Sequence, residues 1–182
     1  KKADELKGSK VAIKIISPDV VHKSDQGAVK VNIEGKDAIL AAYDEMAKHL
    51  EKTIPSVHIE GVLLQPMIKG KEVIVGMKRD SVFGPTIVFG MGGVFVEVFK
   101  DVSMRVPPID KEMAKNMINE IKGSAILRGM RGEKSVNIDA LAKIIVSIAK
   151  MSVEHPEIQE LDLNPVIINE KDAYVVDVRV MK

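Results

Sequence analysis

The sequence predicts an α+β fold. Three stretches repeat their apolar residues at helical spacing, and several shorter stretches show the apolar runs or the alternation typical of β-strands. Strands and helices follow one another without a strict strand–helix–strand rhythm, which favours α+β over a doubly wound parallel sheet. The chain has 182 residues, of which 46% are hydrophobic and 29% charged, so it has enough apolar material for a core.

The first half is expected to consist of strands around one helix. Val11–Ile16 is an apolar run that stops at Ser17-Pro18, and a second strand is expected over 28–33. A helix is expected over 36–51. Its apolar stripe consists of Ile39, Leu40, Tyr43, Met46, Ala47 and Leu50. Further strands are expected over 62–65, 72–77, 86–89 and 94–99.

The second half is expected to contain two helices and a closing pair of strands. Asp110 is a good N-cap for a helix that runs to Ile121 and ends at Gly123. Asn137 or Asp139 is expected to cap the next helix. The apolar face of that helix consists of Leu141, Ile144, Ile145, Ile148 and Met151. Two strands, 159–168 and 173–180, then close the chain.

Composition excludes several classes of protein. The formal net charge of +1 argues against a protein that holds nucleic acid by bulk charge, and 3% aromatic residues argue against base-stacking platforms. The chain has no cysteine, which excludes disulfides, thiolate zinc sites and cysteine nucleophiles. No apolar run approaches the roughly 20 residues that cross a bilayer. We therefore expect a cytoplasmic protein without membrane or nucleic-acid partners.

The closing hairpin predicts a cluster of polar side chains. Its turn at 169–172 sets a register that places Asn164 opposite Asp177, and Asp162 opposite Arg179, all on one face. Opposed residues have Cβ atoms about 5 Å apart, so Asn164 and Asp177 can share one Mg²⁺. The alternative is a hairpin whose polar face is simply solvated. The opposite face, which we expect to pack on the core, carries Leu161, Leu163, Val176 and Val178.

A glycine-rich segment contains Gly90, Gly92 and Gly93. No Gly-Lys-Ser/Thr follows, which excludes a Walker A loop, and the alternating run after it does not fit the dinucleotide fingerprint. Glycines between two predicted strands indicate a hairpin tip whose backbone can approach phosphates closely. The alternative is a tight turn without a ligand.

Two further residues are candidates for phosphate chemistry. Lys14 lies inside an apolar strand, where a buried ammonium needs an anionic partner such as phosphate. The alternative is a lysine that protects an exposed sheet edge. His22 begins a polar loop with Asp25, and an imidazole nitrogen can attack phosphorus and hold it as a labile phosphoramidate. A loop histidine can also be merely solvated, and we interpret His49, on the predicted helix, and His58 and His155, beside prolines, as structural or surface residues.

Taken together, these segments resemble a known family. They run in order through Val-Ala-Ile-Lys-Ile and Val-Val-His-Lys-Ser-Asp (11–25), Gln-Pro-Met (65–67), Phe-Gly-Pro (83–85), Phe-Gly-Met-Gly-Gly (89–93), Leu-Arg-Gly-Met-Arg-Gly (127–132), Leu-Asp-Leu-Asn-Pro (161–165) and Val-Asp-Val-Arg (176–179). This order closely resembles the ATP-grasp β subunit of ADP-forming acyl-CoA (acetyl-CoA) synthetases, relatives of succinyl-CoA synthetase.

The resemblance implies an ATP-grasp fold of two α+β subdomains with mixed or antiparallel sheets, over 1–70 and 71–182. It also implies the reaction acyl-CoA + ADP + phosphate ⇌ carboxylic acid + CoA + ATP, with a CoA-binding α subunit or domain as partner in an α2β2-type assembly. The family normally has several dozen residues ahead of the Lys14 strand, so the N-terminal subdomain is expected to be partial.

The resemblance also implies roles for individual residues. His22 would carry the phosphoryl group to ADP beside Asp25, while Lys14 would contact nucleotide phosphates. The resemblance also implies contacts with each part of the nucleotide. Adenine would be contacted by Gln65, Pro66 and Met67, ribose by Glu72, and the phosphates by Gly90, Gly92, Gly93 and Arg131. Mg²⁺ would be bound by Asn164, Asp177 and, more weakly, Asp162. Three alternatives remain: a non-catalytic regulatory module of an acyltransferase-type fusion, the β subunit of a succinyl- or malyl-CoA ligase, and a nucleotide sensor that forms no phosphohistidine.

Overall fold

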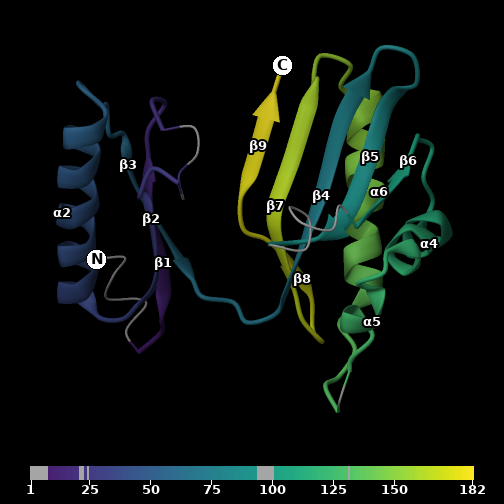
Figure 1. Ribbon diagram of the computed structural model, residues 1–182, viewed down its shortest axis with the longest axis horizontal. Coiled ribbons are helices and arrows are strands. Elements are labelled where there is room, and N and C mark those ends of the chain that lie inside the picture. The colour runs from purple at the N-terminus through teal and green to yellow at the C-terminus, as the bar shows by residue number, and fades with distance from the viewer. Residues whose placement is uncertain (1–7, 21–22, 24, 94–100, 131) are drawn as a thin grey trace. The chain divides into compact units, whose positions relative to one another are not determined.

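The structure is a computed structural model that describes residues 8–20, 23, 25–93, 101–130 and 132–182 (Figure 1). The chain divides into two compact units, Lys1–Ile68 and Lys69–Lys182, and each has its own sheet and its own hydrophobic core. The predicted α+β class is confirmed, because both sheets are antiparallel and each unit also contains helix.

The first unit is a three-stranded sheet covered by one helix. Its elements are β1 (Val11–Ile16), β2 (Val29–Ile33), α2 (Lys36–Thr53) and β3 (Gly61–Pro66), and the strand order is β2-β1-β3. The core forms between one face of β1 and the buried stripe of α2. That stripe is Ile39, Ala42, Met46 and Leu50. The prediction that Leu40 belongs to it is wrong: Leu40 is 53% exposed, because the stripe turns toward Ala42 instead.

The second unit is built on a larger antiparallel sheet. Its strands are β4 (Lys71–Asp80), β5 (Gly84–Met91), β6 (Val102–Arg105), β7 (Glu160–Ile168), β8 (Ala173–Val175) and β9 (Val178–Met181). The strand order is β6-β5-β4-β7-β8, and β9 also pairs with β7. Its helices are α4 (Lys111–Glu120), α5 (Ser124–Leu127) and α6 (Ile138–Glu154). Figure 1 shows α6 running along the sheet behind β4 and β5, so one sheet face carries the core.

The helix starts follow the predicted caps. The Asp110 carboxylate accepts a 2.7 Å hydrogen bond from the Met113 N–H at the start of α4. At the start of α6 the cap is Asn137 rather than Asp139: its side-chain oxygen accepts from the Ala140 N–H at 3.0 Å. Each bond satisfies one of the N–H groups that a helix end leaves without a partner.

The sequence patterns missed three features of the second unit. β6 and α5 were not predicted, since both are too short for their periodicity to be recognised. The expected final strand is divided into β8 and β9, with Val176 and Asp177 between them. The strand expected over 94–99 lies outside the described residues.

Within the described residues, no helix is both long enough and apolar enough to span a bilayer.

Candidate functional site

The polar residues of the closing ribbon, defined as β7 with β8 and β9, lie in the predicted register. Asp162 is opposite Arg179, and the Asn164 N–H donates to the Asp177 carbonyl oxygen at 3.3 Å. The structure therefore brings the three residues with predicted Mg²⁺ roles together at one place on the sheet.

A bulge in β7 separates this polar cluster from the core. β4 and β7 pair as Val75 with Leu163 but as Val73 with Val166, so β7 contains one extra residue at Asn164-Pro165. Leu163 and Val166 are therefore both buried, although residues three apart normally point to opposite faces of a strand. Asp162 and Asn164 lie on the other face of the sheet, which α4 and α6 do not cover.

The expectation that four apolar residues of this ribbon face the core is half correct. Leu161 and Leu163 are buried, at 2% and 4% exposure, but Val178 is 52% exposed. Val178 lies on β9, at the edge of the sheet, where the helices of this unit do not cover it. Val176 falls in the interruption between β8 and β9 and is only partly buried.

Asp162 lies in an environment that resists ionisation. Burial is the largest cause that raises the pKa of its carboxyl group, and the charges of Glu160 and Asp177 raise it further. The Asn164 side chain and the charge of Arg179 lower it. The charges acting on Asp162 are thus two carboxylates, from Glu160 and Asp177, against one guanidinium, and Lys78 lies opposite Glu160 on β4.

The ribbon offers few ligands, and all of them are oxygens. Asn164 is exposed and Asp177 is partly buried, so both can be reached from solvent. In the described part of the chain, no group of three or more His, Cys, Asp or Glu side chains is placed to hold a metal on protein atoms alone. Mg²⁺ bound with a nucleotide needs only one or two carboxylates besides phosphate oxygens and water. The donor set therefore fits Mg²⁺ and does not fit a metal held by protein alone.

The glycine-rich segment covers the end of β5 and the start of the connection from β5 to β6, with which β5 pairs antiparallel. Gly90 lies inside β5 and is buried, and the Gly92 N–H donates to the Glu72 carbonyl oxygen at 2.8 Å. A Cβ atom at Gly92 would stand 3.0 Å from the Glu72 backbone, which explains the need for glycine there. The Gly92 N–H thus serves the sheet and not a phosphate.

Glu72 lies on the same sheet face as the ribbon cluster. Its neighbours Val73 and Val75 are buried in the core, whereas Glu72 alternates to the other face and is exposed. Gly76 follows on that face, directly opposite Asp162. Because Gly76 has no side chain, the surface beside Asp162 is open on the β4 side.

In the first unit, Lys14 lies in the middle of the sheet. It is 6% exposed, on the central strand β1, and points to the face opposite the α2 core. The alternative reading, a lysine that protects a sheet edge, is wrong because β2 and β3 flank β1 on both sides. The stem of Lys14 lies between Val29 and Leu63, its partners in the sheet.

The predicted adenine hinge shares this face. Gln65 pairs with Ala12, two residues from Lys14, and its side-chain Oε1 is buried without a hydrogen-bond partner. Such an orphaned acceptor is costly unless a ligand supplies a donor. The Met67 N–H already donates to the Lys10 carbonyl oxygen at 2.9 Å, and Pro66 has no N–H. An adenine contact here would therefore use carbonyl oxygens or the Gln65 side chain.

His22 and Arg131 lie outside the described residues. The parts of the polar loop that the structure describes are anchored at both ends. The Ala28 N–H donates to the Lys23 carbonyl oxygen at 2.7 Å, and the Asp19 carboxylate accepts from the His58 N–H at 2.8 Å. Asp25 is exposed.

The other three histidines are exposed, as interpreted from the sequence. The His49 ring lies against Gly27: a Cβ atom there would be 3.0 Å from its Cδ2 atom. The His155 Nδ1 atom lies 3.1 Å from the Glu157 carboxylate. Both contacts are structural.

One contributor to the site was missed in the sequence. Glu160 acts electrostatically on Asp162 and follows the same alternation, two residues before it. The spacing of Glu160, Asp162 and Asn164 at alternate positions of one strand was the available signal.

Comparison with known proteins identifies the family. A model of the ATP-grasp domain matches residues 1–181. The chain is 51% identical over 175 residues to acetate–CoA ligase (ADP-forming) I of Archaeoglobus fulgidus, covering 96% of this chain and 25% of that protein. It is 48% identical to the β subunit of acetate–CoA ligase (ADP-forming) I of Pyrococcus furiosus, covering 96% of this chain and 75% of that subunit.

Solved structures agree with this assignment. Acetyl-coenzyme A synthetase 1 of Ca. Korarchaeum cryptofilum, in complex with coenzyme A and Ca-AMPCP, is 44% identical with a TM-score of 0.93 over 99% of this chain and 79% of that one. The same enzyme with Mg-AMPPCP is 40% identical, with a TM-score of 0.84 over 99% and 79% of the two chains. The chain therefore belongs to the ATP-grasp family, within the group that includes the β subunits of ADP-forming acetate–CoA ligases.

Proposed function

We propose that the chain is the nucleotide-binding part of an ADP-forming acyl-CoA synthetase, which catalyses acyl-CoA + ADP + phosphate ⇌ carboxylic acid + CoA + ATP. The observation that carries the proposal is the ribbon register, which puts Asn164 beside Asp177 on the sheet face that α4 and α6 do not cover. The chain spans a quarter of its single-chain relative and three quarters of its subunit relative. A CoA-binding α subunit or domain is therefore part of the proposal, in an α2β2-type assembly.

The proposed Mg²⁺ ligands lie on the ribbon. Asn164 and Asp177 would hold Mg²⁺ through their side-chain oxygens. Bound there with nucleotide, Mg²⁺ neutralises phosphate charge and so favours phosphoryl transfer.

Each unit also contains residues with proposed roles toward the nucleotide. In the first, Lys14 would neutralise phosphate charge and the buried Gln65 Oε1 would accept a hydrogen bond from the adenine amino group. Pro66 and Met67 would complete the adenine hinge. In the second, the exposed Glu72 would contact ribose. The segment from Gly90 to Gly93 and Arg131 would lie toward the phosphates.

His22 would carry the phosphoryl group. A neutral imidazole nitrogen attacks phosphorus with its lone pair, a P–N bond forms, and the P–O bond to the donor breaks. In the second step the terminal oxygen of ADP attacks, a P–O bond forms, and the P–N bond breaks to regenerate the imidazole. Asp25 would orient the ring during both steps.

The phosphoryl relay is tested by labelling. The complete protein, mixed with its CoA-binding partner and ATP labelled in the γ-phosphate, is expected to form an acid-labile phosphorylated species at His22. His22→Asn is expected to abolish turnover and labelling while nucleotide affinity stays within about twofold, since the imidazole contributes to transfer and not to binding. His49→Asn, an exposed histidine on α2, is the matched control. Unchanged turnover in His22→Asn would remove the relay role.

The metal role is tested at the ribbon. Asp177→Ala is expected to weaken Mg-dependent nucleotide binding by about 10- to 100-fold, measured by titration calorimetry with and without Mg²⁺. Asp172→Ala, in the exposed turn of the same ribbon, is the control and should leave the affinity unchanged. Equal affinities for Asp177→Ala and the unmodified protein would reject this site.

A further inference from the structure

The connection between β1 and β2 is longer than these neighbouring strands need. β1 ends at Ile16 and β2 begins at Val29, so residues 17–28 join two antiparallel strands that pair with each other. Hairpin connections usually have about two to five residues. Longer connections carry a disproportionate share of binding and catalytic residues. This one carries His22, the residue proposed above to carry the phosphoryl group.

A side chain of the connection itself holds its first end. At the end of the β1–β3 ladder, the Glu60 N–H donates to the Ile16 carbonyl oxygen at 2.9 Å. Beyond that point, the Asp19 carboxylate accepts a 2.8 Å hydrogen bond from the His58 N–H, on the segment that leads into β3. The Asp19 N–H donates to the Ser17 Oγ atom at 3.1 Å. The Asp19 carboxylate thus extends the ladder past the end of β1.

Buried residues hold the rest of the connection. Val20 is 4% exposed and belongs to the core of the first unit. At the far end Ala28 is buried, its N–H donates to the Lys23 carbonyl oxygen at 2.7 Å, and its carbonyl oxygen accepts from the Ile15 N–H at 2.9 Å. In the sequence, His22 stands two residues after Val20 and one before Lys23. The positions on both sides of it are therefore attached to the first unit.

We infer that Asp19 is a positioning residue of the phosphoryl relay, whose carboxylate fixes the start of the connection so that the His22 imidazole meets phosphorus in a reactive orientation. The inference rests on the function proposed above. Asp19 is exposed, so water would satisfy its carboxylate without this bond. What the bond determines is the path of the chain ahead of His22. A displacement of about 1 Å at a reacting group can cost about 100-fold in rate.

The test compares two variants of Asp19 in the complete protein, combined with its CoA-binding partner. Asp19→Ala removes the acceptor and is expected to lower both kcat and the rate of His22 labelling by γ-labelled ATP by about 10- to 100-fold. Affinity for ADP with Mg²⁺, measured by calorimetry, should stay unchanged. Asp19→Asn keeps an oxygen that can accept from the His58 N–H, so it should retain most of kcat.

The control variant removes an exposed carboxylate elsewhere in the same unit. Asp44→Ala, on α2, should leave kcat unchanged. Asp19 lies outside the core, so its variants should fold, and thermal unfolding checks this. Three results would each overturn the inference: an unchanged kcat in Asp19→Ala, a loss of ADP affinity in place of kcat, or an equal loss of kcat in Asp19→Ala and Asp19→Asn.

Labelling of the unmodified protein separates this inference from the proposed function. If ATP does not phosphorylate His22 in the unmodified protein with its partner, the proposed function itself is rejected. If His22 is labelled equally fast in the unmodified protein and in Asp19→Ala, only the positioning role is rejected.

Discussion

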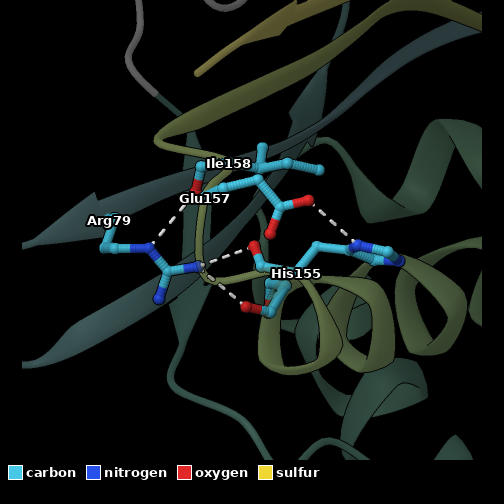
Figure 2. A network of polar contacts seen from close by, with 5 residues as sticks. Arg79, His155, Glu157 and Ile158 are labelled. Carbon is cyan, nitrogen blue, oxygen red and sulfur yellow. Dashed lines mark hydrogen bonds and ion pairs between the residues drawn. The ribbon is translucent and has the colours of Figure 1, made fainter.

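Arg79 on β4 donates a 2.8 Å hydrogen bond to the carbonyl oxygen of Ser152 near the end of α6. The same guanidinium also donates to the carbonyl oxygens of His155 and Ile158, at 3.3 and 3.2 Å (Figure 2). The last carbonyl groups of a helix have no partner within the helix. The Arg79 guanidinium therefore supplies hydrogen bonds to carbonyl groups at the end of α6 and links this helix to the sheet that carries the ribbon cluster.

Replacing Arg79 is expected to destabilise the second unit. Arg79→Lys keeps a positive charge but cannot reach three carbonyl oxygens in a fixed fork. We expect the free energy of unfolding to fall by about 2 kcal/mol, because hydrogen bonds to charged groups contribute about 1.5–3 kcal/mol. Denaturant unfolding of the complete protein measures the change. Lys78→Ala, on the adjacent exposed position, should change it little, and an equal loss in both variants would contradict this role.

Lys14→Met is expected to weaken nucleotide binding without unfolding the protein. Methionine preserves the apolar stem of a side chain that is 6% exposed, but it removes the ammonium that would meet phosphate. Loss of charge-assisted hydrogen bonds of about 1.5–3 kcal/mol corresponds to roughly a 10- to 100-fold weaker affinity. Calorimetry with ADP and Mg²⁺ checks this.

Lys30→Met is the matched control for Lys14. Lys30 lies on the neighbouring strand β2 and forms an ion pair with Glu45 on α2, on the opposite side of the sheet from Lys14. Its replacement should leave the affinity for nucleotide unchanged. If both variants bind nucleotide like the unmodified protein, Lys14 has no phosphate role.

Asp139 gives the contact between α4 and α6 a defined pH dependence. Hydrogen bonds from Lys115 and Lys111, at 2.9 and 3.0 Å, lower the pKa of its carboxyl group from 3.8 to about 2. A carboxylate with a lowered pKa adds stability above its unfolded pKa and loses that contribution as pH falls toward the folded value.

We therefore compare Asp139→Asn with the unmodified protein by thermal unfolding across the acid range. The difference between their midpoints should stay constant at neutral pH, shrink as pH falls below about 4, and vanish only once the pH is well below the folded pKa of about 2. High salt should reduce the difference at neutral pH, because both lysines and Asp139 are solvent-accessible. A difference that grows with acidification would contradict this sign.

Replacing two glycines of the 127–132 loop distinguishes the cost of backbone strain from the cost of steric crowding. Gly129 and Gly132 have positive φ angles of 86° and 88°, so alanine is strained at both positions. A Cβ atom at Gly129 would stand 2.3 Å from the Glu133 carbonyl oxygen, whereas at Gly132 nothing lies within 4 Å. We expect Gly132→Ala to cost about 1 kcal/mol and Gly129→Ala about 3 kcal/mol or more. Denaturant unfolding measures both, and equal costs would show that crowding is unimportant.

Local patterns predicted most of the elements and the ribbon register. Asp162 faces Arg179 because side chains alternate along strands and the short turn leaves one pairing. The helix caps at Asp110 and Asn137 follow from side-chain chemistry within three residues. The order of the motifs also identified the family, since it spans nearly the whole chain.

Other features depend on residues that are distant in sequence. The central position of Lys14 follows from the pairing of β1 with both β2 and β3, and β3 lies some fifty residues along the chain. The β7 bulge arises against β4, and it decides which neighbours of Asn164 are buried. Sequence alone determined which side chains alternate together and which family they represent, because these depend on local geometry and motif order. Tertiary structure decided which face is covered and which residues flank Asn164, because burial and polar neighbours come from strands and helices that meet only in the fold.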